Sequence, residues 1–168
     1  DQTKNVVIFD ESAKRLYLAR TGLITAQAGV ALPNHETPMA VLTAERTLGD
    51  GAAELQLKLE SAPIDGRRLV KTYTFRRGDY VIGVKHEFFN EGTATVSPQL
   101  YMQLERDGTA PEGESKWYFT FTGPAMYTEA NHYKKIDFGD IEKGKADHDK
   151  SSTSGWIAMV QHYFASAW

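Results

Sequence analysis

A run of strictly alternating residues, from Glu54 to Glu60, limits what this chain can fold into more than any other feature. It reads Glu-Leu-Gln-Leu-Lys-Leu-Glu, with a leucine at every second position. Successive side chains of a β-strand point to opposite faces of the sheet, so the run predicts a strand with one leucine face and one polar face. Such alternation is typical of an antiparallel sheet that packs one face on a core and turns the other to water.

Three more strand patterns follow this run at short intervals. They are rich in β-branched and aromatic residues, which favour strands, and turn-forming residues separate them. The strands are predicted at 68–76, 80–89 and 93–105, with turns at Asp65-Gly66, 77–79 and 90–92. Pro98 indicates a bulge or an edge position in the last strand, because proline cannot donate to the strand ladder. Four consecutive strands joined by short turns predict a meander or a Greek-key unit.

The rest of the chain predicts shorter strands and polar loops. Strands are expected at 6–9, 15–19, 23–28, 116–122, 126–127 and 133–136, with a weaker pattern at 41–45, and loops at 31–38, 106–115 and 139–155. The last segment, 156–168, fits both helical and strand spacing, but its aromatic residues and the preceding glycine favour a strand. No other segment has the pattern of a long helix. The sum predicts an all-β sandwich in which residues 1–168 form a single domain.

Composition excludes several classes of site and partner. The 168 residues carry 19 basic and 22 acidic side chains, and this near balance argues against a nucleic acid as the main partner. The chain has no cysteine, which excludes disulfides, cysteine-based zinc sites and a thiol nucleophile. The longest fully apolar run is Trp156 to Val160, far short of the roughly 20 residues that a membrane-spanning helix needs.

Motifs for catalysis, cofactors and metals do not stand out. The five histidines are dispersed, without ligand spacing: His35, His86, His132, His148 and His162. Asp147-His148-Asp149 could in principle hold a cation, but a solvated charged loop is the favoured interpretation, because a metal site needs more converging ligands. We therefore predict no catalytic, cofactor-binding or metal-binding residues. Aromatic residues cluster at 117–121 and 163–168, and their outward-facing half could line a groove for an apolar ligand or a partner.

Several segments of the chain together resemble a known family. They are Lys71 to Val81 with Asn90-Glu91-Gly92, then 121–128 with 133–138, and finally Gly155 to Trp168. In their order and spacing they resemble the large periplasmic domain of the YidC membrane-protein insertase family, over most of the chain from about residue 16 onward.

The resemblance implies a β-supersandwich similar to galactose mutarotase, of which this chain is an incomplete fragment. It implies a docking and scaffold domain without catalysis, tethered to the membrane in the full protein and placed at the periplasmic face of the inner membrane of Gram-negative bacteria. The full protein is an insertase and chaperone that assists the insertion and folding of membrane proteins, with or without the Sec translocon.

The resemblance also implies partners. It assigns the stretch from 118 to 168 to contact with SecF, an accessory subunit of the Sec translocon, and it adds nascent membrane proteins as a second class of partner. Within that stretch we expect aromatic side chains to make the contact, namely Tyr127, Tyr133, Trp156 and Tyr163.

The incomplete fold that the resemblance implies has two consequences. Because the family domain extends beyond both ends of this chain, we expect exposed sheet edges and self-association of the fragment. A mutarotase-like fold also leaves two alternatives open, an aldose-epimerase-like enzyme and a sugar- or peptide-binding module. The enzyme would need a carboxylate beside His86 or His162, the two histidines in predicted strands, and fold similarity alone gives it little support.

Overall fold

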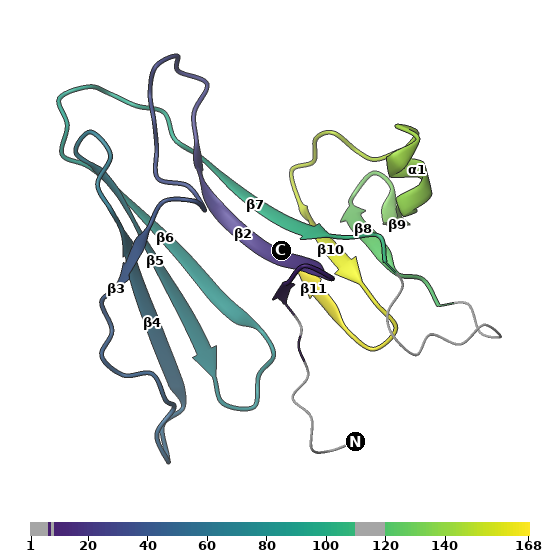
Figure 1. The fold of residues 1–168 in the computed structure, drawn as a ribbon, viewed down its shortest axis with the longest axis horizontal. Coiled ribbons are helices and arrows are strands. Elements are labelled where there is room, and N and C mark those ends of the chain that lie inside the picture. The colour runs from purple at the N-terminus through teal and green to yellow at the C-terminus, as the bar shows by residue number, and fades with distance from the viewer. Residues whose placement is uncertain (1–6, 8, 110–119) are drawn as a thin grey trace. The chain divides into compact units, whose positions relative to one another are not determined.

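The computed structural model describes residues 7, 9–109 and 120–168, and nearly all of its regular structure is β-strand (Figure 1). The all-β class predicted from the sequence is confirmed. The chain divides into two compact units, one formed by residues 1–20 and 102–168 and the other by residues 21–101. The elements are β1 (Asp10–Glu11), β2 (Leu16–Ile24), β3 (Met39–Val41), β4 (Glu54–Ser61), β5 (Arg67–Arg76), β6 (Ile82–Asn90), β7 (Gln99–Arg106), β8 (Gly123–Thr128), β9 (His132–Lys135), α1 (Phe138–Glu142), β10 (Gly155–Val160) and β11 (Ala165–Ala167).

The unit of residues 21–101 contains an antiparallel sheet in the order β3-β4-β5-β6 (Figure 1). The alternating run predicted as a strand is β4, and it pairs along its length with β5. Asp65 and Gly66 make the turn between these strands with φ values of 49° and 75°, a left-handed conformation that aspartate tolerates and glycine favours. The predicted meander therefore holds for these consecutive strands.

A buried apolar cluster of this unit lies on the face of the sheet to which Leu69 points. Leu69 is 1% exposed and packs with Leu23 and Leu32. Partly buried apolar side chains surround this cluster, namely Val30, Phe88 and Val96. Away from the cluster, the leucines of β4 are only half-buried, so the leucine face is present as predicted but incompletely covered.

A buried polar cluster adjoins this core. Lys71 is 5% exposed, and its ammonium donates to the carbonyl of Thr21 at 2.6 Å. His86 lies directly opposite Lys71 across β5 and β6, and its ring hydrogen-bonds to the Thr21 hydroxyl. Burial lowers the pKa of Lys71, and burial followed by the charge of Lys71 lowers the pKa of His86. Both groups therefore hold their protons less tightly than they would in water.

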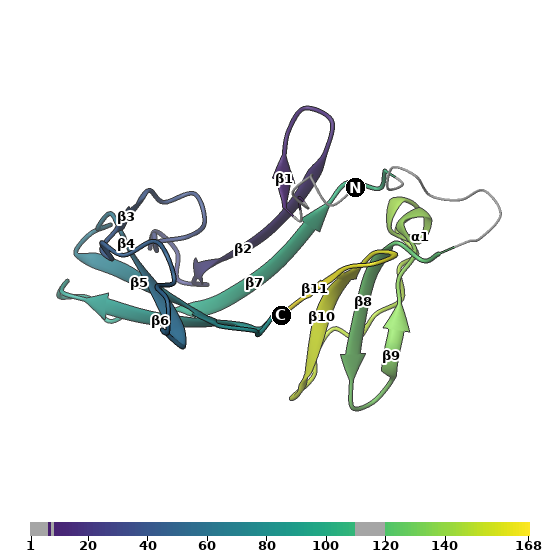
Figure 2. The ribbon, with the colours of Figure 1, turned by 90° about the horizontal axis from the view of Figure 1, so that it is seen from below.

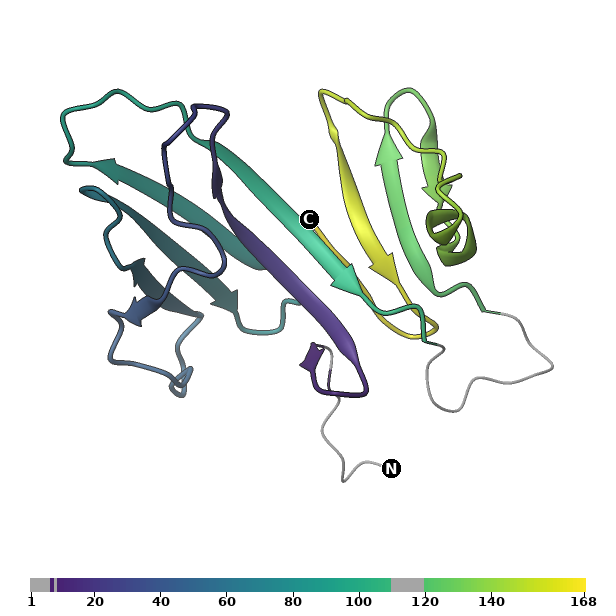
Figure 3. The ribbon, with the colours of Figure 1, turned by 45° about the horizontal axis from the view of Figure 1, so that its top comes forward.

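A second sheet has the order β1-β2-β7, and Figure 3 shows β2 and β7 side by side. The sequence suggested two strands, 15–19 and 23–28, where the structure has the single strand β2. Gly22 lies inside this strand. The position requires glycine, because a Cβ there would stand 2.6 Å from the Tyr101 hydroxyl and 2.7 Å from the Asn34 Cα. A glycine inside a strand often marks such a close approach of another chain segment, and here it does not end the strand.

The end of β7 is fixed to β2 by Asp107. Its carboxylate accepts from the backbone N–H of Leu16 at 2.7 Å and from that of Thr109 at 2.8 Å. Burial alone would raise the pKa of Asp107, but these hydrogen bonds outweigh it and lower the pKa to about 2. The carboxylate is therefore most strongly bound in its charged form.

The unit that contains residues 102–168 has an antiparallel sheet in the order β11-β10-β8-β9, of which Figure 2 shows β10, β8 and β9 side by side. Ala125, Ala158 and Met159 are its buried apolar residues, between 2% and 6% exposed. The Met159 carbonyl accepts a hydrogen bond at 3.5 Å from the hydroxyl of Tyr17, which is also buried. Small side chains at the β8–β10 contact let the two strands share a closely packed interior.

Several predicted elements before residue 110 need correction. The strand predicted at 41–45 is instead β3, which begins and ends earlier, at Met39–Val41. Of the strand predicted at 6–9, Val7 and Phe9 lie outside any strand, and residues 6 and 8 lie outside the described residues. The strand predicted at 93–105 begins only at Gln99, immediately after Pro98. It also leaves the meander, because β7 pairs with β2 in the other sheet. Proline thus precedes the strand and makes no bulge within it.

The second half of the chain differs from prediction in three places. Residues 120–122 are not in a strand, and 110–119 lie outside the described residues, so the aromatic cluster at 117–119 is not placed. Gly123-Pro124 begins β8, although it was predicted to end a strand. The helix α1 interrupts the predicted loop at 139–155, with the Asp137 carboxylate capping it through the Gly139 N–H at 2.7 Å.

The last segment is β-structure, as favoured from its sequence. It forms β10 and β11, joined by a turn at 161–164 that the spacing analysis did not predict. Within residues 7, 9–109 and 120–168, no helix has the length and apolar character needed to cross a membrane. The single domain expected over residues 1–168 stays a prediction.

Candidate functional site

Three aromatic side chains lie in one line across β10, β8 and β9. Trp156 is directly opposite Tyr127 in the β8–β10 ladder, and Tyr127 is directly opposite Tyr133 in the β8–β9 ladder. Residues opposite each other in an antiparallel ladder point to the same face of the sheet. We call these three residues the aromatic row.

The rings of the aromatic row contact one another. Tyr127 and Trp156 are stacked, with ring centroids 6.0 Å apart and planes inclined by 19°. Tyr133 meets the Trp156 ring at 5.9 Å with a 42° tilt. Trp156 is 38% exposed and Tyr133 is 48% exposed, while Tyr127 is half-buried. The row therefore presents a continuous aromatic surface that its own packing holds in place.

Gly155 sets the position of the aromatic row against β8. Its φ is 139°, and a Cβ there would lie 2.0 Å from the carbonyl oxygen of Tyr127. No side chain fits at that distance, so only glycine allows β10 to begin this close to β8. The next residue, Trp156, is thereby held against the Tyr127 ring.

A polar loop, residues 149–154, borders the aromatic row. The Asp149 carboxylate accepts hydrogen bonds from the Thr128 hydroxyl and, at 2.5 Å, from the Asn131 amide. The hydrogen bond from Thr128 has the largest effect and lowers the pKa of Asp149. Desolvation opposes it less strongly, and the hydrogen bond from Asn131 adds to the lowering. These contacts tie the loop to the end of β8 and to the β8–β9 turn.

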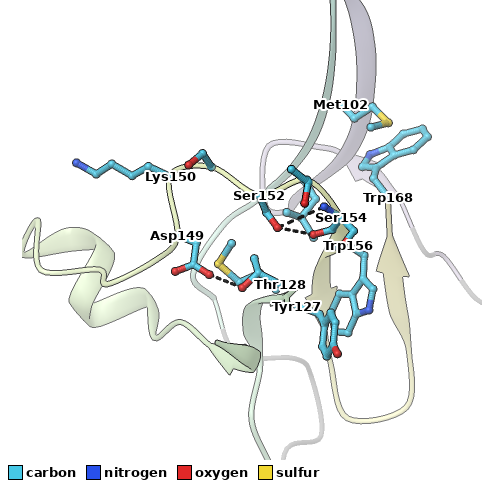
Figure 4. A pocket seen from close by; sticks show the side chains of 14 residues that line it. Met102, Tyr127, Thr128, Asp149, Lys150, Ser152, Ser154, Trp156 and Trp168 are labelled. Carbon is cyan, nitrogen blue, oxygen red and sulfur yellow. Dashed lines mark hydrogen bonds between the residues drawn. The ribbon is translucent and has the colours of Figure 1, made fainter. Parts of the chain in front are cut away.

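A surface cavity of about 380 Å³ lies between this loop and the sheet. Figure 4 shows the Tyr127 and Trp156 rings beside each other at one part of its wall, with Met102 and Trp168 at another. The Trp168 indole N–H donates to the carbonyl of Gln103 at 3.2 Å, which fixes that ring. An apolar wall with hydroxyl groups at its rim has the composition of a surface that binds another protein.

The structure brings together three of the four residues predicted to bind a partner. Tyr127, Tyr133 and Trp156 form the aromatic row, whereas Tyr163 lies in the turn after β10 and is 82% exposed. Its ring contacts His162 at a centroid distance of 4.0 Å. That Tyr163 binds a partner stays a prediction, and if it does so it acts apart from the row.

The histidines considered for the enzyme alternative lie in different settings. His162 is in the turn at 161–164, so its predicted place in a strand is wrong. His86 is in β6 as predicted, but the groups around it are the hydroxyl of Thr21 and the charge of Lys71. Among the residues that the structure describes, no three His, Asp or Glu side chains converge as metal ligands.

Sequence reasoning missed the role of the polar loop. It weighed Asp147-His148-Asp149 as a cation site and favoured a solvated charged loop, whereas Asp149 binds Thr128 and Asn131. Asp147 accepts from the Lys134 ammonium at 2.5 Å. The useful signal was the pairing of acidic loop residues with hydroxyl, amide and ammonium groups in the β8–β9 hairpin.

Comparison with known proteins identifies the family of this chain. The family model of the YidC periplasmic domain matches residues 1–168. Three relatives bear the name membrane protein insertase YidC: that of Cupriavidus pinatubonensis is 52% identical over 165 residues, that of Janthinobacterium is 49% identical over 167, and that of Bordetella pertussis is 44% identical over 165. The alignments cover 98% to 99% of this chain but only 28% to 29% of each relative. The chain belongs to the YidC periplasmic domain family.

Proposed function

We propose that this chain is a docking and scaffold domain of a membrane-protein insertase, that it acts without catalysis, and that it lies at the periplasmic face of the bacterial inner membrane. The family match over the whole chain and the name shared by its relatives support this proposal. The chain spans less than a third of those relatives, so it contributes a surface to the whole protein and leaves insertion itself to other segments.

The aromatic row is the observation that carries the docking role. Tryptophan and tyrosine are the residues most enriched among those that contribute most to protein–protein binding, since each buries a large area at a small entropic cost. Trp156 and Tyr133 are partly exposed, and the Trp156 ring contacts both Tyr127 and Tyr133, so the row is preorganised for a partner.

SecF is the partner we propose for this surface. The aromatic row falls within residues 118–168, the stretch that the family resemblance assigns to SecF. A row of three rings with a polar loop beside it fits an apolar segment of a protein whose backbone can hydrogen-bond to the loop hydroxyls. Through this contact the domain would hold the insertase beside the Sec translocon while membrane proteins insert and fold, and nascent chains would be its second class of partner.

Photo-crosslinking in the intact insertase tests the proposal. A benzophenone amino acid replaces Tyr133 in one variant and Trp156 in another, and the matched control replaces Tyr80, which is fully exposed in the other unit of the chain. We expect adducts with SecF from positions 133 and 156 and none from position 80. Adducts only with nascent chains would move the docking role from SecF to substrate, and no adduct from either position would refute a docking role of the row.

A further inference from the structure

The edge strand β6 has one side without a strand partner in the described part of the chain. It pairs with β5 on one side and ends the order β3-β4-β5-β6 on the other (Figure 1). Its nine residues span about 30 Å at the usual rise of a strand. The free N–H and C=O groups of so long an edge are a template for pairing with another strand.

The sequence of β6 is complementary to itself about His86. Two copies of Ile-Gly-Val-Lys-His-Glu-Phe-Phe-Asn, aligned antiparallel around a two-fold axis through His86, set each residue opposite the one equally far on the other side of the axis. Lys85 then faces Glu87 of the partner subunit, and Glu87 faces the partner's Lys85. Opposite charges placed directly across two strands stabilise the pair, and symmetry makes this contact twice.

Neighbouring registers lack this complementarity. A shift that keeps the same faces together moves the axis to Lys85 or to Glu87, and each of these then faces its own copy. Like charges directly opposite each other destabilise a strand pair. A shift of one residue moves the axis to a point between two residues. The face of β6 that carries Val84 and Phe88 would then adjoin the face of the other copy that carries Lys85 and Glu87.

The remaining pairs of the favoured register fit as well. Val84 would face Phe88 of the partner subunit, so the apolar face of one sheet would continue into the next. Gly83 would face the partner's Phe89, a side chain that is 37% exposed. Space exists there, because the nearest neighbour of a Cβ built on Gly83 would be Thr74 at 3.5 Å. An aromatic ring across from a strand glycine covers backbone that would otherwise be exposed.

We propose that two copies of this chain associate through β6, antiparallel and two-fold symmetric, in the register that pairs Lys85 with Glu87 of the partner subunit. Lys85 is exposed and already contacts Glu87 of its own strand at 2.9 Å, so pairing exchanges or shares that contact between copies. A single nine-residue edge buries less area than a standard interface, so we expect a dimer with a dissociation constant in roughly the micromolar range. The self-association expected from the sequence thereby gains a defined surface.

Charge reversal tests the edge and its register together. Lys85→Glu and Glu87→Lys each set two like-charge pairs across the axis, and we expect each to weaken dimerisation by about tenfold or more in sedimentation velocity. A mixture of the two variants restores opposite charges at both contacts and should form a heterodimer as tightly as the unmodified chain forms its dimer. The double variant Lys85→Glu/Glu87→Lys should pair with itself again.

Lys145→Glu is the matched control. Lys145 is exposed and lies in the other unit of the chain, so the substitution makes the same charge change away from the edge. We expect it to leave the dimer unchanged, and circular dichroism verifies that all variants are folded. A chain that stays monomeric up to about 1 mM would overturn the proposal. So would a dimer that the single reversals do not weaken, or that the mixture does not restore.

Discussion

Replacing Gly155 by alanine should destabilise the sheet that carries the aromatic row. The added Cβ would lie 2.0 Å from the Tyr127 carbonyl oxygen, whereas real Cβ contacts below 3.0 Å are essentially never found. The backbone fixes the position of the Cβ, and the oxygen is itself a backbone atom, so one of the two paired strands must shift. That shift would break the register that places Trp156 opposite Tyr127.

The magnitude follows from two contributions. A residue other than glycine at φ 139° adopts a sparsely populated backbone conformation, which costs about 1–3 kcal/mol. Displacing a paired strand to relieve the overlap adds about 1–3 kcal/mol, as overpacking of an interior does. We therefore expect Gly155→Ala to lower the free energy of unfolding by about 2–6 kcal/mol.

Urea denaturation followed by far-ultraviolet circular dichroism measures this loss. Gly78→Ala is the matched control, because Gly78 also has a positive φ, 75°, but a Cβ there would meet nothing within 4 Å. The control should cost only about 1 kcal/mol, the backbone term alone. If the two substitutions destabilise equally, the close approach of Gly155 to Tyr127 does not exist as described.

Three further predictions concern stability and its dependence on pH. Leu69→Ala should lower the free energy of unfolding, measured by urea denaturation, by about 3 kcal/mol, and Leu57→Ala should lower it clearly less. The reason is that Leu69 is almost fully buried and Leu57 only half-buried, so equal losses would contradict the placement of the core. Burial and then the charge of Lys71 lower the pKa of His86, so the unfolded chain binds more protons and stability should fall as the pH drops below about 6.5. His86→Gln should flatten that decline in thermal melts at a series of pH values, and an unchanged slope would refute the assignment. Asp107→Asn should lower the free energy of unfolding by about 1 kcal/mol at neutral pH. Burial raises the pKa of Asp107, but hydrogen bonds outweigh it and hold the pKa at about 2, so the difference between the two proteins should shrink between about pH 4 and pH 2. A loss independent of pH would show that the charge of Asp107 is not what matters.

Local patterns predicted the strands between residues 54 and 90 well. The alternation at 54–60 became β4 because a period of two is a property of a few neighbouring residues and needs no knowledge of the rest of the fold. Asp65-Gly66 made its turn for the same reason. The sequence could not show that β7 leaves this sheet for β2, since partner choice depends on contacts between distant segments.

The errors have physical causes that a single sequence hides. The strands expected at 15–19 and 23–28 are the single strand β2, and the position of Gly22 within it requires glycine because the Tyr101 hydroxyl and the backbone at Asn34 occupy the space of a side chain. Pro124 resembled the end of a strand, yet it is the second residue of β8, where its carbonyl accepts from the Ile136 N–H at 2.9 Å. The helix α1 had a signal that went unused, an aspartate cap followed by an acidic first turn.

The aromatic row was only partly accessible to sequence reasoning. Its three members were expected to bind a partner, but their alignment depends on the registers of two ladders. Register follows from which faces are buried and from turn geometry, and neither is visible in composition. Tyr163 looked equivalent by residue type and lies instead in a turn.

The most direct test of the docking surface is the affinity of the intact insertase for SecF when the aromatic row is truncated. Tyr133→Ala combined with Trp156→Ala removes its two most exposed rings, and Tyr80→Ala removes a fully exposed ring elsewhere. We predict that the double variant binds SecF at least about tenfold more weakly than the unmodified protein, while the control binds as before. An affinity for SecF that the double variant leaves unchanged would contradict the account.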